Sequence, residues 1–417
     1  MKVLRKIEKY GYRFLGEGFK VSNNTRETHL NNNDLVVGSS GTSKTGSIVY
    51  TQLKSLRDSS LIVMDTKGRL HKMFREELCQ KGYKVKVIDF VNPENSCVYN
   101  PLDYIRRVGE GYKEQDIARV CSAIFPGNLA KDEPFWEMSA RSMLEFFMAY
   151  TLEALPEEDH HMNTISRLFR IYQQSPGRAN FLHWIEDNKN SLAAKRYYQI
   201  KAVQTADKTV ASINAFFYLG MRMFDYREFQ GIFVPGYHGD NSRDNIDIAS
   251  IGKEKTVVFI NTSDSDHSMD QLINIFYTQV LQTLMAEADG NESGQLEVPV
   301  RIIMDDFASN AIIPDFDKLI SVVRSRDIWL TLCIQSLTQL ETLYSESQAL
   351  TIQNNCDHII YMGSNDLSSA QFIGTRAQKT PETILCMSRE MEYILEAGKP
   401  VYMIPKIPSY SFEEEQA

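Results

Sequence analysis

A chain of 417 residues is longer than a single hydrophobic core usually supports, so its length favours two domains. Its content of 43% hydrophobic and 24% charged residues is that of an ordinary soluble globular protein. The formal net charge of −9 excludes a protein that coats nucleic acid with its whole surface, although a local basic channel is compatible with it.

The six cysteines form no C-x-x-C pair, so the sequence suggests neither a zinc site nor a disulfide framework. Most of them lie in apolar runs and are expected to be buried free thiols, which fits a reducing cytoplasm. Neither a signal peptide nor an apolar run long enough to span a bilayer is recognised, so a cytoplasmic location is expected.

The first 34 residues are polar and are predicted to form an N-terminal arm, 1–34, with short extended structure. An apolar strand at 35–37 then leads into a loop of small residues, and a first helix is expected over 45–56. The loop reads Gly38, Ser39, Ser40, Gly41, Thr42, Ser43, Lys44 and Thr45. It follows the phosphate-binding pattern G-x-x-x-x-G-K-[ST], except that a serine occupies the place of the second glycine.

Each part of this loop has a physical role in binding phosphate. Backbone N–H groups of residues 41–45 would point at the phosphates, helped by the positive end of the following helix. Lys44 would supply a charge to the outer phosphates, and the Thr45 hydroxyl would help to hold Mg²⁺. A glycine at position 43 would allow a positive φ, which costs a serine about 1–2 kcal/mol. The alternative interpretation is an ordinary Gly/Ser turn.

The next segments alternate between strands and helices, which is typical of a parallel α/β sheet. Strands are predicted at 61–65 and 85–90, with a helix at 70–81 between them. The segment from 111 to 230 contains no convincing strand, so an inserted all-α domain is predicted there. Its helices are expected at 135–154, 162–174, 179–188, 192–203 and 209–226.

The sheet is predicted to resume after this insertion, so the α/β domain consists of 35–110 and 231–408. An acidic tail, 409–417, follows and is expected to be disordered at its glutamates. The later strands are expected at 256–261, 300–306, 329–335, 358–363 and 401–405, and the later helices at 269–288 and 314–326.

Polar groups follow several of the predicted strands, and ligands of open parallel sheets bind at the carboxyl ends of strands. Asp65 ends the second predicted strand of the sheet, Asp305 and Asp306 end another, and Gln335 ends a third. Asp305 would hold the water shell of Mg²⁺, Asp306 would orient or activate the attacking water, and Gln335 would sense the γ-phosphate or the water. A solvated strand end is the alternative for the acidic pair alone; with the phosphate loop upstream, the pattern favours a Mg-ATP site.

The chain resembles the type IV coupling proteins, the TraG/TraD-like ATPases of conjugative DNA transfer and type IV secretion, over about residues 10–408. The phosphate loop at 35–45 resembles the family's Walker A motif and Ile303–Phe307 its Walker B motif. Further matching segments, in the same order along the chain, are Ile62–Gly68, Tyr99-Asn100-Pro101-Leu102, Phe135-Trp136, Ile313-Pro314-Asp315-Phe316, Arg324-Ser325-Arg326, Ile334-Gln335-Ser336 and Gly363-Ser364-Asn365-Asp366.

The resemblance implies a RecA-like P-loop NTPase domain with an inserted all-α domain, assembled as a homo-hexamer around a channel. It implies ATP and Mg²⁺ as cofactors and single-stranded DNA, or relaxase and effector proteins, as substrates. A neighbouring subunit would supply an arginine to the γ-phosphate, with Arg324 as first choice and Arg326 as second; a helix C-terminal charge is the alternative role for Arg324. The match at Ile62–Gly68 places Asp65 and Lys67 near the nucleotide, although Lys67 could instead face the channel or be solvated.

Four departures from the family's pattern bear on activity. Ser43 replaces a glycine, Asp306 a longer glutamate and Arg69 an acid, and the N-terminal membrane helices common in the family are not seen. A shorter carboxylate reaches the attacking water less well, and misplacement of a catalytic group can cost about 10²-fold. Mg-ATP binding is therefore predicted more firmly than fast hydrolysis.

Three functions remain open from the sequence. The first is a coupling-protein-like ATPase that works with membrane-bound type IV secretion components, which would recruit it to the inner face of the membrane. The second is a non-hydrolysing scaffold of the same fold that recruits secretion substrates. The third is a general FtsK/HerA-like DNA pump, against which the Asn-Pro turn and the Phe-Trp entry to the helical insertion argue.

Overall fold

The computed structural model describes residues 10–127, 134–203, 207–235, 244–263, 265–266, 268–307 and 312–413. Its centre is a nine-stranded sheet with the order β13-β12-β11-β3-β10-β9-β4-β8-β5. The strands are β3 (Asp34–Gly38), β4 (Ser60–Thr66), β5 (Lys84–Asp89), β8 (Thr256–Thr262), β9 (Val300–Met304), β10 (Ile328–Ile334), β11 (His358–Gly363), β12 (Met391–Glu396) and β13 (Tyr402–Pro405).

Within this sheet the adjacent strands β11, β3, β10, β9, β4, β8 and β5 pair in parallel, whereas β12 and β13 add an antiparallel edge. The predicted, mostly parallel sheet is therefore confirmed, but β12 was not predicted. Both faces of the central strands are buried, which explains their continuous apolar runs. On β3, Val36 belongs to the core on one face, while Leu35 and Val37 belong to the core on the other.

The helix that follows the phosphate loop covers the Val36 face of the sheet, beside α3 (Arg69–Gln80). Its first turns form a π-helix, Lys44–Val49, which continues as α2 (Tyr50–Lys54). The remaining helices of the α/β part are α11 (Ile248–Ile251), α12 (Asp270–Gly290), α13 (Phe316–Val322), α14 (Leu337–Tyr344), α15 (Glu346–Asn354), α16 (Leu367–Ala377) and α17 (Pro381–Leu385). Of these helices, α12 and α13 were predicted from the sequence, whereas α11 and α14–α17 were not.

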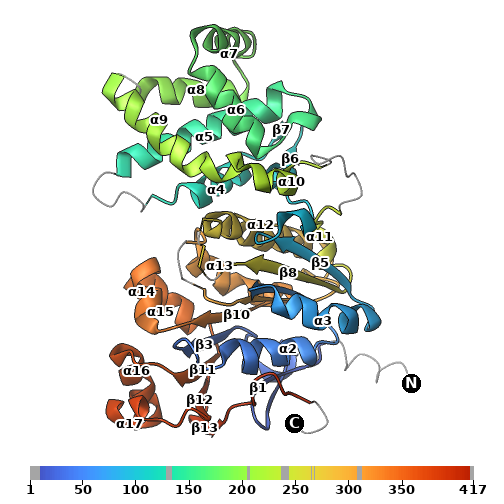
Figure 1. Cartoon of the computed structure of the whole chain (residues 1–417), viewed down its shortest axis with the longest axis vertical. Helices are drawn as coiled ribbons and strands as arrows, with labels where there is room; N and C mark the ends of the chain where they lie inside the picture. The colour runs from blue at the N-terminus through green and yellow to red at the C-terminus, as the bar shows by residue number, and fades with distance from the viewer. Residues whose placement is uncertain are drawn as a thin grey trace.

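Helices from the middle of the chain stack at one end of the molecule, next to α12 (Figure 1). They are α4 (Glu114–Ile124), α5 (Pro134–Ala154), α6 (Met162–Tyr172), α7 (Ser175–Asp187), α8 (Leu192–Val203), α9 (Asp207–Met221) and α10 (Gln230–Phe233). A two-residue pairing of β6 (Arg107–Val108) with β7 (Gly111–Tyr112) precedes them. Aromatic rings such as Phe146 and Phe147 pack against each other and fill the helical core.

Short 3₁₀ turns connect several of these elements. They lie at Pro93–Asn95, Pro101–Tyr104, Glu157–Asp159, Arg222–Asp225, Arg227–Phe229 and Val323–Arg326. None of the helices in the described ranges combines the length and the apolar composition that a bilayer-spanning helix requires.

Both ends of the described chain are more structured than predicted. The N-terminal arm contains a hairpin of β1 (Tyr12–Gly16) and β2 (Phe19–Ser22), followed by α1 (Thr25–Thr28). At the other end, Phe412 is buried against Phe14, with 4.9 Å between ring centroids. The segment 409–413 is therefore anchored, and the tail's remaining residues, 414–417, lie outside the described ranges.

The expectation that most cysteines are buried is only partly met. Cys121, Cys333 and Cys356 are buried, but Cys79 and Cys386 are exposed on the surface. All six are free thiols, and the described residues contain no group of three His, Cys, Asp or Glu side chains placed to hold a metal ion.

Candidate nucleotide site

The phosphate loop joins the carboxyl end of β3 to the π-helical turns that begin at Lys44. Gly41 and Ser43 both adopt the left-handed conformation, with φ of 80° and 71°. The serine at the second glycine position thus takes the backbone shape that glycine normally provides, at a conformational cost. A Cβ at Gly41 would have nothing within 4 Å, so the backbone of the loop is open to a closely approaching ligand there.

Hydrogen bonds within the loop and to β11 fix its shape. The Lys44 ammonium donates to the carbonyl oxygen of Gly38 at 2.6 Å and to that of Ser39 at 3.3 Å. The Ser39 N–H donates to the carbonyl of Gly363 at 2.9 Å, and the Thr42 hydroxyl donates back to Ser39 at 2.8 Å. The buried ammonium therefore lies inside the turn of the loop, where phosphate-binding lysines are required.

The acidic carboxyl end of β9 contacts the phosphate loop directly. The Thr45 hydroxyl donates to a carboxylate oxygen of Asp305, 2.5 Å away. Asp305 is buried, and this burial raises the pKa of its carboxyl group, an effect that the Thr45 hydrogen bond and the nearby Lys44 ammonium oppose. A hydroxyl beside a buried carboxylate is the donor set that Mg²⁺ takes in phosphate-loop proteins.

Asp306 is partly buried and has a φ of 57°, a left-handed backbone that re-aims the chain immediately after β9. Its N–H donates to the other carboxylate oxygen of Asp305 at 3.2 Å. Asp305, predicted to hold the metal, and Asp306, predicted to orient the attacking water, therefore lie together at the end of β9.

Gln335 reaches the same edge of the sheet from β10. Ile334 pairs with Val37 in the parallel register of β10 and β3, so Gln335 follows beside Gly38. Its side chain is exposed, and its N–H donates to the Gln339 side chain at 2.9 Å. The structure thus brings Gln335, the loop and Asp305 together on three adjacent strands.

Asp65 reaches this edge of the sheet, but its carboxylate is engaged elsewhere. Its two oxygens accept the N–H groups of Arg69, Leu70 and His71 at 2.8–3.1 Å, which caps the start of α3. Burial raises the pKa of this carboxyl group, and the three backbone donors oppose the rise. The geometry assigns Asp65 to helix capping and shows no contact with the phosphate loop.

Lys67 lies in the turn after β4 with a φ of 83°. It lines a separate cavity of about 400 Å³, together with His71, Arg75 and Asn261. The structure therefore does not bring Lys67 to the phosphate loop.

The two candidate arginines lie at the opposite edge of the sheet from the phosphate loop. They precede β10, at its amino end, whereas the loop follows the carboxyl end of β3. Arg324 donates to the carbonyl of His29 at 3.0 Å, and Arg326 forms a two-fold ion pair with Asp289 at 2.7 and 3.1 Å. Neither arginine is brought to the loop of its own chain.

Lys406 is a neighbour of the loop that no pattern in the sequence indicates. Its ammonium donates to the carbonyl of Met362 at 2.7 Å and to that of Thr42 at 3.3 Å. Tyr410 follows, and its N–H donates to the carbonyl of Gly46 at 3.0 Å. A Cβ at Gly46 would lie 1.8 Å from the Ser409 hydroxyl, so the C-terminal segment fits closely against the start of the π-helix.

The sheet, the phosphate loop and the acidic end of β9 define a RecA-like P-loop fold that carries an all-α part. The family model described as type IV secretory system conjugative DNA transfer matches residues 7–402, and the chain belongs to that family. No curated protein sequence matches it.

Several solved structures share the fold. The unbound conjugative coupling protein TrwBΔN70 aligns with a TM-score of 0.71 at 13% identity, covering 100% of this chain and 93% of that one. TrwB in complex with the ATP analogue ADPNP aligns with a TM-score of 0.67 at 12% identity, covering 100% and 94%. VirB4 of Thermoanaerobacter pseudethanolicus aligns with a TM-score of 0.54 at 12% identity, covering 92% and 91%. The expected family and fold class are therefore confirmed.

Proposed function

We propose that this protein is a MgATP-driven motor of conjugative DNA transfer, which moves or recruits single-stranded DNA or its protein carriers toward a type IV secretion channel. The observation that carries the proposal is the Thr45–Asp305 hydrogen bond. It joins the end of the phosphate loop to the end of β9, where the metal and phosphates of a bound nucleotide would lie. Structures of TrwB in complex with ADPNP and with ADP and Mg²⁺ support this assignment.

The backbone and side-chain groups of the phosphate loop have the chemistry that binding a nucleotide requires. The open backbone at Gly41 and the N–H groups of residues 41–45 would receive the phosphates, and Lys44 would balance their charge. Thr45 and Asp305 would hold Mg²⁺, which supplies charge neutralisation when bound. Asp306 would position the attacking water, and Gln335 would report the state of the γ-phosphate to β10 and α14.

A ring of subunits would supply an arginine for the γ-phosphate, which a single chain does not bring to its own phosphate loop. Arg324 lies at the sheet edge opposite to the loop of its own chain, so it can reach a phosphate only in a neighbour. Closed cyclic assemblies place one edge of each subunit against the opposite edge of the next. We therefore propose a homo-oligomeric ring, a hexamer in its active form, with Arg324 acting in trans.

The family's role in type IV secretion also defines the proposed location and partners. The protein would act at the cytoplasmic face of the membrane, recruited there by a membrane-bound component of the secretion machinery. Its substrates would be single-stranded DNA or the relaxase and effector proteins delivered with it.

A non-hydrolysing scaffold is the second candidate, and the backbone at two positions favours it. Ser43 has the strained left-handed conformation, and Asp306 carries a carboxylate one methylene shorter than the usual glutamate on a left-handed backbone. Either feature can weaken turnover without preventing nucleotide binding. The retained Lys44, Thr45 and Asp305 favour the motor.

Binding of a fluorescent ADP, with and without Mg²⁺, tests the proposed site. We expect saturable binding that Lys44→Ala abolishes, whereas Asp305→Asn removes mainly the gain due to Mg²⁺. Asp305→Asn keeps the side-chain shape and removes a buried charge, so its thermal unfolding should match the wild type. Binding that is unaffected by both changes would place the nucleotide elsewhere and refute the assignment.

A further inference from the structure

The chain that follows β13 runs along the phosphate loop on the side away from the acidic end of β9. In the sheet, β3 lies between β10 and β11. Asp305 at the end of β9 and Gln335 at the end of β10 approach the loop from one side. From the other side, Lys406 donates to the carbonyl of Met362 on β11 at 2.7 Å. The residues after Lys406 therefore border the loop opposite to the proposed Mg²⁺ ligands.

Two of these residues contact Gly46, which comes directly after Lys44 and Thr45. The Tyr410 N–H donates to the Gly46 carbonyl at 3.0 Å. A Cβ at Gly46 would lie 1.8 Å from the Ser409 hydroxyl and 3.0 Å from Cε2 of the Tyr410 ring. Any side chain at position 46 would therefore displace them, and glycine there lets the Tyr410 ring lie beside the first turn of the π-helix.

The Tyr410 ring is held at this position but is not buried. Tyr50, on α2, contacts it edge to face, with 5.5 Å between the ring centroids and 79° between the ring planes. Such a contact covers at most one face of a ring, and Tyr410 remains 49% exposed. An exposed aromatic ring beside a phosphate loop offers a flat apolar surface to the ligand that occupies the loop.

The backbone at Tyr410 is strained. Its φ is 57°, a left-handed value that is unusual for a bulky residue. Strained residues persist only where surrounding contacts hold them, and they cluster at ligand-binding sites. Here the contacts on the two sides are the Lys406 hydrogen bonds and the buried Phe412 ring, whose centroid is 4.9 Å from that of Phe14. The segment 406–412 therefore holds the Tyr410 ring in place from both ends.

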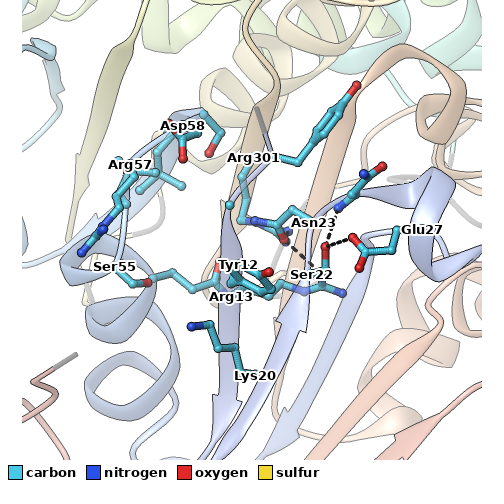
Figure 2. Close-up of a pocket in the computed structure, with 17 residues that line it drawn as sticks. Tyr12, Arg13, Lys20, Ser22, Asn23, Glu27, Ser55, Arg57, Asp58 and Arg301 are labelled. Carbon is cyan, nitrogen blue, oxygen red and sulfur yellow. Dashed lines mark hydrogen bonds between the residues drawn. The ribbon is translucent and has the colours of Figure 1, made fainter. Parts of the chain in front are cut away.

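The β1–β2 hairpin, which provides Phe14, is a firm support for this segment. Arg13 contacts Asp34 at the start of β3, 3.0 Å away, and both side chains are buried. Arg13 and Arg301 both donate to the Asn23 side chain at the end of the hairpin, at 3.0 and 3.3 Å (Figure 2). These buried hydrogen bonds fix the hairpin to β3 and β9, so Phe14 is a fixed contact for the C-terminal segment.

The direction of a bound nucleotide follows from the polarity of the loop. In phosphate loops the backbone N–H groups cradle the α- and β-phosphates, whereas the lysine reaches the β- and γ-phosphates. The metal bridges the β- and γ-phosphates. With Thr45 and Asp305 at the metal, the γ-phosphate would lie toward β9 and β10, and the α-phosphate nearer to Gly46. The ribose and base would then leave the loop on the side of Tyr410.

We propose that Tyr410 stacks on the base of the bound nucleotide, so that the segment 406–412 forms the base-binding side of the site. This inference rests on the proposed function, since it assigns a further residue to the same site. Base–aromatic stacking is tolerant of base identity because every base has a π-face. Tyr410 would therefore favour a nucleotide over bare polyphosphate without selecting adenine over guanine.

Calorimetry on the whole chain in the presence of Mg²⁺ tests this role with ADP, GDP and pyrophosphate. Pyrophosphate has no base, so its affinity reports the phosphate loop alone. Tyr410→Ala should weaken the binding of ADP and of GDP by at least about 5-fold and that of pyrophosphate by less than about 2-fold. Tyr410→Phe keeps an aromatic ring and should bind all three ligands as the wild type does.

A fluorescence measurement detects the stacking itself. Etheno-ADP carries its fluorophore on the base, and stacking on an aromatic ring quenches it. We expect quenching on binding to the wild type and to Tyr410→Phe, and its loss in Tyr410→Ala. This readout does not depend on a measurable affinity for pyrophosphate.

Tyr218→Ala is the matched control, because it removes a tyrosine of similar exposure, 53%, from α9. It should leave all three affinities unchanged. Alanine bears the strain of a positive φ as tyrosine does, so Tyr410→Ala removes the ring and keeps the backbone cost. Thermal unfolding of each variant, with the pyrophosphate affinity, checks that the loop remains intact.

Two kinds of failure are distinguishable. Wild-type protein that binds neither ADP nor pyrophosphate would refute the nucleotide site, and this inference with it. A nucleotide site that stands while Tyr410→Ala leaves ADP binding and quenching unchanged would overturn the stacking role alone. Equal weakening of ADP and pyrophosphate would also overturn it, because the ring would then only support the loop.

Discussion

Thr45 and Asp305 are 260 positions apart in the chain, yet the hydroxyl of one lies 2.5 Å from the carboxylate of the other. The contact arises because β3, β10 and β9 are adjacent parallel strands whose carboxyl ends meet at one edge. Two weak signals in the sequence, an altered phosphate loop and a strand that ends in acids, thereby become one site. The proposed nucleotide site of this chain depends on that contact.

Ser43→Gly should relax the phosphate loop, because Ser43 has a φ of 71° and glycine adopts this conformation without strain. We expect a gain in unfolding free energy of about 0.5–1 kcal/mol, smaller than the relieved strain because glycine also frees the unfolded chain. Chemical denaturation measures it.

Ser40→Gly is the matched control for this change, since Ser40 lies in the same loop without a positive φ. It should be neutral or slightly destabilising. Equal gains from both glycine variants would contradict the strain at Ser43.

Glu392→Gln should change how stability depends on pH. Glu392 lies on β12 with both carboxyl oxygens buried and unpaired, and burial raises its pKa from 4.5 to about 8 despite the nearby Lys406. Between these pH values the folded state retains a proton that the unfolded state releases. Stability due to this group is therefore full below pH 4.5 and falls as pH rises to about 8, by an amount on the order of a few kcal/mol.

The glutamine variant stays neutral, so its stability relative to the wild type should increase from pH 5 to pH 8 and then level off. Denaturant titrations of both proteins across this range measure the difference. A constant difference would mean that Glu392 is ionised throughout. The comparison also cancels the opposite contribution of His358, whose lowered pKa acts equally in both proteins.

Mixing two inactive variants tests whether Arg324 of one subunit acts at the nucleotide site of its neighbour. Arg324→Ala should lower turnover by about 10³-fold if this arginine completes a neighbour's site. Equal mixing with Lys44→Ala subunits should then restore roughly a quarter of the sites, because a closed ring places intact Arg324 beside intact Lys44 at random. Arg326→Ala is the control, since Arg326 is held by Asp289 and should keep near-normal turnover. No recovery on mixing would contradict a role in trans.

The central strands and the phosphate loop were predictable because their signals are local. Buried parallel strands appear in the sequence as short apolar runs, and the phosphate loop has a fixed spacing of small residues before Lys44. The position of Ser43 in the left-handed region also follows from that spacing. By contrast, β12 carries the buried Glu392 within its apolar residues, which obscured it.

The roles of several polar residues could not be predicted, because they depend on contacts distant in sequence. Asp65 ends a strand, as a metal ligand would, but the start of α3 takes up its carboxylate. Lys406 reaches Thr42 across 364 positions, and Arg13 and Arg301 are brought together by Asp34 and Asn23, to which both donate. No local pattern distinguishes such residues from solvated ones.

The most direct test of the account is steady-state ATP hydrolysis in the presence of Mg²⁺, with and without single-stranded DNA, for the wild type, Lys44→Ala and Ser43→Gly. We expect wild-type turnover that DNA stimulates and that Lys44→Ala lowers by at least about 100-fold. Turnover only in Ser43→Gly would favour the scaffold. No turnover in any of the three proteins, or equal turnover in the wild type and Lys44→Ala, would contradict the proposal that the Thr45–Asp305 site drives a motor.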